Sequence, residues 1–341
     1  MSRVQVWAAI SGGVDSALAA ALAADAGAEV VGVTLDLGLG DDVLGAAAAV
    51  ATSLGIEHRV VDARVAFEEW VIEPFVRAYA GGRTPNPCVA CNEHIKLGML
   101  AEAARTAGAE RLVTGHYARI MDTSRGPRIA RAVDLVKDQS YFLYRVDPDL
   151  VRYIDFPLGR LTKAEVRLLA VARGIPVAEH PDSQDVCFLA GMNSGAYVCS
   201  RMPGACVPGP ILDVGGREIG EHRGLCHYTV GQRKGLPGGQ GPYFVTALDP
   251  ERNAVIAGTR AECEVARVVA RDVVWSGADI QEVAVCVRAR STVVSAAVVR
   301  SDERLEITLE HPVCAAPGQS VVCYKGDVLV GGGTIVREYM G

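Results

Sequence analysis

The sequence predicts an α/β protein in which a doubly wound parallel sheet precedes two smaller β-rich domains. Strand-like apolar runs alternate with helix-like segments in the first part of the chain, and the alternation stops after Pro181. Short alternating runs fill the last part, as in small antiparallel β-barrels. With 341 residues, 50% of them hydrophobic, the chain is long enough to bury several cores. We expect domains at 1–202, 203–264 and 265–341.

The N-terminal domain begins with the order strand, helix, strand, helix, strand. Strands are predicted at 4–10, 29–35, 58–62 and 111–115, and helices at 17–24, 42–54, 66–80 and 93–107. This order favours a parallel sheet that binds its ligand in the crevice at the carboxyl ends of the strands. A further helix is predicted at 162–173, where Thr162 and Glu165 form a capping box.

The β-rich domains follow a stretch rich in proline and glycine at 203–216. The central domain has predicted strands at 243–248 and 253–257 and a glycine-rich basic loop at 224–241. In the C-terminal domain, strands are predicted at 283–287, 293–299, 305–309, 320–324 and 328–331.

Composition narrows the class of protein. The net charge of −6 argues against a generally basic nucleic-acid binder, although a local basic face can still bind phosphates. No uncharged apolar run reaches the roughly 18 to 20 residues of a membrane helix, so we expect a cytoplasmic protein without membrane association. In that reducing compartment, cysteines favour catalytic or metal roles over structural bridges. Seven of the ten are expected to be inert fillers: Cys199, Cys206, Cys226, Cys263, Cys286, Cys314 and Cys323.

The stretch Ser11-Gly12-Gly13-Val14-Asp15-Ser16 lies between the first predicted strand and the first helix. Glycines let backbone N–H groups approach an anion, and a helix N-terminus adds partial positive charge, so this turn predicts a phosphate site. Asp15 beside phosphates indicates a divalent cation, with Mg²⁺ the usual choice. The plainer alternative is a glycine turn with a Ser or Asp helix cap. The stretch resembles the pyrophosphate loop of ATP pyrophosphatases, which cleave ATP between the α and β phosphates.

Three cysteines lie in segments suited to chemistry. Cys88 and Cys91 form a CxxC in a loop rich in proline and glycine, and Cys187 follows at a distance. A lone CxxC is compatible with a zinc half-site, a redox pair or chance. Because Cys91 precedes the helix expected at 93–107, the helix dipole should lower its pKa and favour the thiolate.

The segment 119–173 is basic and contains aromatic residues. Its basic residues include Arg119, Arg125, Arg128, Arg131, Lys137, Arg145, Arg152, Arg160, Lys163, Arg167 and Arg173, among which lie Tyr141, Phe142 and Tyr144. Basic residues interleaved with aromatics suit a polyanion with stackable bases, and the alternative is a solvated helix face.

Seven motifs in order resemble those of the bacterial tRNA-specific 2-thiouridylases. They are SGGVDS at 11–16, GRTPNPCVACN at 82–92, TGHYAR at 114–119, KDQSYFLY at 137–144, DSQDVCF at 182–188, TVGQRKGL at 229–236 and PGQSVVCY at 317–324. The resemblance implies that ATP adenylates the C2 oxygen of wobble uridine 34 in tRNA. Sulfur then replaces this oxygen, giving 2-thiouridine, AMP and pyrophosphate. The implied partners are tRNAs of the lysine, glutamate and glutamine types and a sulfur donor such as a cysteine desulfurase or a sulfur-relay protein.

The resemblance also assigns roles to residues. Cys187 matches the thiol that carries a persulfide, and Cys91 matches the partner that attacks or resolves it, leaving a Cys91–Cys187 disulfide. The nucleotide-binding positions are Ala9, Ile10, Ser11, Gly12, Gly13, Val14, Asp15, Ser16, Leu35 and Gly115. The positions that contact tRNA are Asn86, Pro87, Cys88, His116, Lys137, Asp138, Gln139, Arg288, Ala289 and Gln319.

Three positions depart from the family pattern. Some relatives carry aspartate, a candidate general acid or base, where this chain has Cys88. Leu35 often corresponds to methionine. Arg288-Ala289-Arg290-Ser291 often corresponds to Arg-Tyr-Arg-Gln, so a stacking tyrosine is lost here.

Other functions compete with this interpretation. An amidotransferase-type synthetase would use the same loop, but it needs an ammonia source and has no use for Cys91 and Cys187. Cys88, Cys91 and Cys187 could instead ligate an iron–sulfur cluster with one open iron site, as an added cofactor. A non-catalytic nucleotide-binding module would leave the cysteines and the basic segment unexplained.

Overall fold

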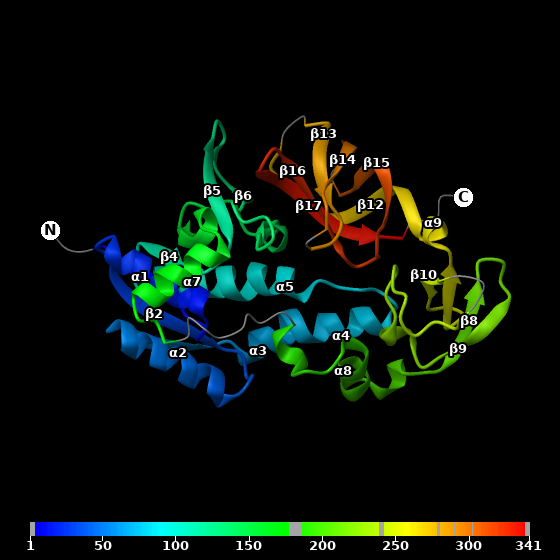
Figure 1. Ribbon diagram of the computed structural model, residues 1–341, viewed down its shortest axis with the longest axis horizontal. Helices are drawn as coiled ribbons and strands as arrows, with labels where there is room; N and C mark the ends of the chain where they lie inside the picture. Colours follow the sequence, from blue (N-terminus) through cyan, green and yellow to red (C-terminus); the bar gives the residue numbers. More distant parts are fainter. Residues whose placement is uncertain are drawn as a thin grey trace. The chain divides into compact units, whose positions relative to one another are not determined.

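The computed structural model describes residues 4–176, 186–238, 242–277, 280–289, 291–301 and 303–337 (Figure 1). The chain divides into two compact units. Unit 1 comprises residues 1–71, 88–187 and 327–329, and unit 2 comprises 72–87, 188–326 and 330–341. The predicted boundaries at 202/203 and 264/265 stay a prediction. Within the described residues, no helix combines the length and the apolar character that a membrane crossing requires.

A five-stranded parallel sheet forms the centre of unit 1. Its strands are β1 (Gln5–Ala9), β2 (Glu29–Asp36), β3 (Glu57–Asp62), β4 (Arg111–Val113) and β7 (Ile154–Asp155), in the order β3-β2-β1-β4-β7. β1 therefore has β2 on one side and β4 on the other, and both pairings are parallel. The order of strands reverses between β1 and β4, and ligands of doubly wound sheets bind at that switch point.

Helices α1 (Val14–Asp25), α2 (Asp41–Leu54) and α7 (Lys163–Ala172) belong to the same unit. Four alanines of α1 are buried and share a core with the apolar side chains of β1: Ala17, Ala19, Ala20 and Ala21. Small side chains let α1 approach the sheet closely, so the start of this helix is held firmly beside the end of β1. As predicted, α7 begins with a capping box between Thr162 and Glu165.

The two long helices predicted at 66–80 and 93–107 contain π-helical stretches. The first consists of α3 (Arg64–Phe67), η1 (Glu68–Ile72) and α4 (Glu73–Ala80), and the second of α5 (Pro87–Ala90), η2 (Cys91–Met99) and α6 (Leu100–Thr106). The second helix therefore begins at Pro87, earlier than predicted, because proline is well tolerated in a first helical turn. Wider π turns often occur at functional sites.

Three further elements of unit 1 follow β4. They are the hairpin of β5 (Ala118–Thr123) and β6 (Gly126–Arg131) and two short 3₁₀ turns, η3 (Ser140–Leu143) and η4 (Pro157–Arg160). Strand β6 also pairs with residue 328, so the chain segment 327–329 belongs to this unit.

Unit 2 contains two β-structures. A four-stranded sheet has the order β10 (Phe244–Asp249), β11 (Ala254–Gly258), β8 (Gly209–Asp213) and β9 (Glu218–His222). The second is built from β12 (Glu264–Trp275), β13 (Glu282–Cys286), β14 (Val294–Arg300), β15 (Leu305–Cys314), β16 (Ser320–Lys325) and β17 (Val328–Val336). Pairing of β12 with both β15 and β17 closes these strands into an antiparallel barrel. The predicted α/β class with a parallel sheet and a β-barrel is thus confirmed.

The helical elements of unit 2 are short. They are η5 (Cys187–Leu189), α8 (Ser194–Arg201), η6 (Pro203–Ala205), η7 (Leu225–His227) and α9 (Arg260–Cys263), of which η5 begins at the last residue of unit 1.

Candidate functional site

The loop at 11–16 is ordered by its own serines. The backbone N–H of Ser11 donates to Ser16 Oγ at 3.1 Å, and Ser16 Oγ donates to the carbonyl of Gly13 at 2.9 Å. Helix α1 starts directly after Gly13, and no side chain caps it. The alternative of a Ser or Asp cap is therefore wrong, and the first-turn N–H groups have no side-chain acceptor. Such groups suit an anion.

Three glycines shape this turn in different ways. A Cβ atom on Gly12, whose φ is +79°, would lie 2.7 Å from Ala46 Cβ. One on Gly115 would lie 2.7 Å from the backbone nitrogen of Ser16, so the chain after β4 packs directly against the first turn of α1. By contrast, the nearest atom to a Cβ on Gly13 is Ser11 Oγ at 3.8 Å. The side of Gly13 where a Cβ would point is open, as an approaching phosphate requires.

Asp15 is held by two residues that are distant in sequence. Lys163 Nζ lies 2.7 Å from Oδ1 and 2.8 Å from Oδ2, and the Tyr117 hydroxyl donates to Oδ1 at 2.8 Å. Lys163 is only 9% exposed. The prediction that Lys163 belongs to an RNA-binding basic face was wrong, because its ammonium forms an ion pair with Asp15. An ionised carboxylate has about four acceptor positions, so three bonds leave one for a cation.

Other residues of the basic segment are also ion-paired. Arg119 pairs with Asp327, Arg145 with Glu93, and Arg173 with Asp25. These pairs offset part of the positive charge that the sequence indicated for 119–173.

Cys88, Cys91 and Cys187 are free thiols in unit 1, and all three interact electrostatically with Lys96. Burial raises the pKa of Cys91 to about 11, although the charge of Lys96 opposes this shift. The predicted low pKa of Cys91 was wrong because Cys91 lies within a continuous helical segment, buried, rather than just before a helix N-terminus. Desolvation likewise raises the pKa of Cys88, although its side chain keeps solvent-accessible surface.

Lys96 is the residue of this cluster that sequence reasoning missed. Its pKa is raised: desolvation lowers it, but the negative charges that Cys91, Cys88 and Cys187 can carry outweigh that effect. A permanent ammonium beside three thiols lowers the free energy of each thiolate. The sequence offered one indication of this contact: Lys96 lies five residues after Cys91 in the same helical segment.

His116 belongs to a buried hydrogen-bond chain. Its Nδ1 lies 2.8 Å from Thr114 Oγ1, and its Nε2 lies 3.2 Å from Asn92 Oδ1. Burial, with a contribution from Lys96, lowers the pKa of His116 to about 3, so the ring is neutral near pH 7. Asn92 directly follows Cys91, so this chain ties the cysteine helix to the end of β4.

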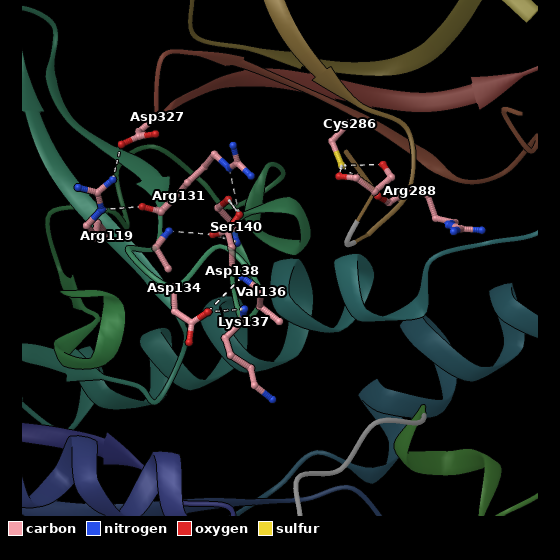
Figure 2. Close-up of polar contacts among 12 residues, drawn as sticks. Arg119, Arg131, Asp134, Val136, Lys137, Asp138, Ser140, Cys286, Arg288 and Asp327 are labelled. Carbon is pink, nitrogen blue, oxygen red and sulfur yellow. Dashed lines mark hydrogen bonds and ion pairs between the residues drawn. The ribbon is translucent and has the colours of Figure 1, made fainter. Parts of the chain in front are cut away.

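The segment 137–139 is fixed by its own side chains (Figure 2). Asp138 accepts from the N–H groups of Ala132 and Ser140, and from Ser140 Oγ. Gln139 Oε1 accepts from the N–H of Tyr117 at 2.9 Å. In Figure 2 the side chain of Lys137 extends away from these contacts. Asp138 and Gln139 thus position the segment, and the contact of all three residues with tRNA stays a prediction.

The remaining predicted tRNA residues lie around Gln319 and the barrel. Gln319 Nε2 donates to the carbonyls of Thr84 and Pro85 at 3.0 and 3.2 Å, which fixes the chain just before Asn86 and Pro87. The carbonyl of Arg288 accepts from Cys286 Sγ at 2.9 Å, and Ala289 follows it (Figure 2). Arg290 and 182–185 lie outside the described residues.

Leu35 lies at the end of β2, and Thr34 beside it donates to the carbonyl of Ile10 at 2.8 Å. The predicted nucleotide positions 9–16, 35 and 115 are therefore gathered at one end of the sheet. Their contact with a nucleotide stays a prediction.

This chain is similar to known protein families and to individual proteins of known name. The tRNA methyl transferase HUP domain matches residues 4–191, the tRNA methyl transferase PRC-barrel domain 196–259, and the aminomethyltransferase beta-barrel domain 265–335. The tRNA-specific 2-thiouridylase MnmA of Chloroflexus aurantiacus is 45% identical over 97% of this chain and 98% of that protein. The protein of the same name from Roseiflexus castenholzii is 43% identical over 99% of this chain and 100% of that one.

Among solved structures, NMN synthetase from Francisella tularensis shares 16% identity. The match covers 60% of this chain and 78% of that chain, with a TM-score of 0.35.

We predict that Gly115→Ala weakens ATP binding by on the order of tenfold or more, because the new methyl group would displace the first turn of α1. Isothermal titration with a non-hydrolysable ATP analogue measures this. Gly45→Ala is the matched control: Gly45 lies within helix α2, and a Cβ there has no atom within 4 Å. Equal ATP affinity in both variants would contradict the packing argument.

We predict that alkylation of Cys91 by iodoacetamide accelerates about tenfold per pH unit between pH 7 and 10, because its pKa is about 11. Lys96→Met should slow labelling at every pH in this range, and Lys96→Arg should preserve it. Peptide mass spectrometry gives the rates, with Lys137→Met as the control. A plateau below pH 8 would show a low-pKa thiolate instead.

Proposed function

Because this chain belongs to the tRNA-specific 2-thiouridylase family, we propose that it uses ATP to adenylate the C2 oxygen of uridine 34 in tRNA and replaces that oxygen with sulfur. The products are 2-thiouridine, AMP and pyrophosphate. The observation that carries the proposal is that unit 1 holds both an anion-binding helix start at 11–16 and a cluster of three free thiols around Lys96.

The first step is attack of the uridine C2 oxygen on the α-phosphorus of ATP, with pyrophosphate as the leaving group. Negative charge grows on the leaving oxygens, and the uncapped N–H groups of α1 stabilise it. Mg²⁺ would bind the remaining acceptor position of Asp15 and supply further positive charge. Lys163 and Tyr117 hold that carboxylate in one orientation.

The second step transfers sulfur from a persulfide on Cys187. The Cys91 thiolate attacks the inner sulfur of the persulfide, which forms the Cys91–Cys187 disulfide and releases hydrosulfide. Hydrosulfide adds to C2, and AMP leaves with the former uridine oxygen. A dithiol reductant then supplies the two electrons that restore both thiols. Lys96 favours the Cys91 thiolate that starts this sequence.

Substrate and donor classes follow the family resemblance. We propose lysine-, glutamate- and glutamine-type tRNAs as substrates, and a cysteine desulfurase or a sulfur-relay protein as the source of the persulfide. The residues proposed to contact the tRNA are Asn86, Pro87, Cys88, His116, Lys137, Asp138, Gln139, Arg288, Ala289 and Gln319.

A second possibility concerns the cofactor. Because Cys88, Cys91 and Cys187 interact with one another, they also suit three thiolate ligands of an iron–sulfur cluster. An aspartate at position 88 in some relatives is a poor substitute for such a ligand, which favours the cysteine pair.

We predict that Asp15→Ala lowers pyrophosphate release by on the order of 100-fold while tRNA affinity is preserved, because Asp15 acts on the phosphates. Pyrophosphate is measured by a coupled assay and tRNA binding by filter retention. Asp25→Ala, at the other end of α1, is the matched control and should behave as wild type. Pyrophosphate release at the wild-type rate in Asp15→Ala would contradict the proposed role of Asp15 at the phosphates.

We predict that Cys88→Ser retains 2-thiouridine formation, whereas Cys91→Ser and Cys187→Ser each abolish it. The double variant should be no worse than either single one, because the pair acts as a unit. Mass spectrometry of nucleosides from tRNA incubated with ATP, Mg²⁺ and a persulfide donor measures the product, with Cys286→Ser as control. Loss of activity in all three serine variants, together with an iron-dependent visible absorption, would establish the cluster instead.

A further inference from the structure

Four potential metal ligands converge in unit 2, away from the thiols of unit 1 in sequence. Cys199 lies on α8, Cys206 directly follows η6, and Cys226 and His227 lie on η7. Their sulfur atoms and one imidazole nitrogen all lie within 4.8 Å of one another. The sequence predicts inert fillers at Cys199, Cys206 and Cys226. That prediction was wrong for Cys199 and Cys206, which are joined by a disulfide.

Three of the distances in this cluster suit a tetrahedral zinc site. Cys199 Sγ lies 3.7 Å from Cys226 Sγ and 3.4 Å from His227 Nε2, and Cys206 Sγ lies 3.6 Å from Cys226 Sγ. Ordinary Zn–S and Zn–N bond lengths in a tetrahedron put neighbouring ligand atoms about 3.5 to 3.8 Å apart. Cys199 Sγ and Cys206 Sγ are bonded to each other, so they must separate before both can bind the metal.

His227 is held in place beside Cys199. Gly195 on α8 packs against its ring near Nδ1, so closely that any Cβ atom at position 195 would collide with the ring. On the other side of the ring, Nε2 lies 3.4 Å from Cys199 Sγ. His227 Nδ1 is buried without a hydrogen-bond partner among the described residues.

Cys199 and Cys206 are joined by a disulfide in this structure, with their Cα atoms 5.7 Å apart. This bond is therefore not the Cys91–Cys187 disulfide expected from the family resemblance, since those two cysteines are free. A dithiol reductant converts the bond to two thiols by giving up two electrons and two protons, and becomes a disulfide itself. Metal binding then displaces the protons from three thiols.

We propose that the reduced protein binds one Zn²⁺ through Cys199, Cys206, Cys226 and His227 Nε2. Four protein ligands leave no open position, so the ion is structural: it joins α8 and the turn after it to η7. The ligand pattern is C-x₆-C-x₁₉-C-H. This pattern contains no CxxC, so the spacing usual for zinc sites does not reveal it.

The test is the zinc content of full-length protein purified with a phosphine reductant, measured by plasma mass spectrometry. We expect one zinc per chain in the wild type and in Cys314→Ser, and less than about a tenth of that in Cys226→Ser and His227→Ala. The triple variant Cys88→Ser, Cys91→Ser, Cys187→Ser should keep its zinc, which separates this site from the sulfur-transfer cysteines.

A second measurement uses only the wild-type protein, so it does not depend on whether the variants fold. Chelator-treated, reduced wild-type protein is titrated with Co²⁺, which should give thiolate-to-cobalt and tetrahedral absorption bands that saturate at one equivalent and disappear on adding Zn²⁺. The proposal is overturned if the reduced wild type contains no zinc and binds no cobalt. Zinc retained in Cys226→Ser, zinc lost in the triple variant, or a Cys199–Cys206 disulfide that persists under reductant without metal would equally overturn it.

Discussion

The ion pair between Asp15 and Lys163 is the interaction on which the loop at 11–16 depends. A carboxylate placed in a turn that favours anions would repel an incoming phosphate. Lys163, almost fully buried, neutralises it, and the Tyr117 hydroxyl fixes its orientation. The pair joins the first turn of α1 to α7, two elements separated by most of the domain's sequence. Removing Asp15 would leave the ammonium of the buried Lys163 uncompensated in a poorly solvated position.

The thiol cluster shows the opposite electrostatic balance. Burial makes the Cys91 thiolate costly, and Lys96 reduces that cost without removing it. The resting cysteine is therefore largely protonated near pH 7, which protects it from oxidation and alkylation. The neutral His116 beside Asn92 keeps additional charge out of the same region.

Much of the fold followed from local sequence. The alternating elements, the glycine turn after β1, the capping box at Thr162 and the barrel strands β13 to β17 were predicted from periodicity and turn residues, whereas β12 was not. The closure of the barrel through β12 and β17 and the switch point between β1 and β4 confirm the predicted class.

What could not be predicted depended on long-range contacts. Lys163 is one basic residue among many in its segment, and nothing local distinguishes it as the partner of Asp15. Cys91 was expected to precede a helix, but Pro87 starts that helix earlier and buries the thiol. Cys226 and His227 lie on η7, about 20 residues after Cys206, and the packing of α8 on η7 brings them to Cys199 and Cys206.

The central claim is that the anion site at 11–16 serves to attach AMP to the uridine oxygen. The most direct measurement uses a tRNA whose uridine 34 carries ¹⁸O at C2, incubated with ATP, Mg²⁺ and a persulfide donor. Mass spectrometry of the released AMP should find one ¹⁸O per molecule, in step with 2-thiouridine formation. The label appearing in water or in pyrophosphate, with unlabelled AMP, would contradict the account.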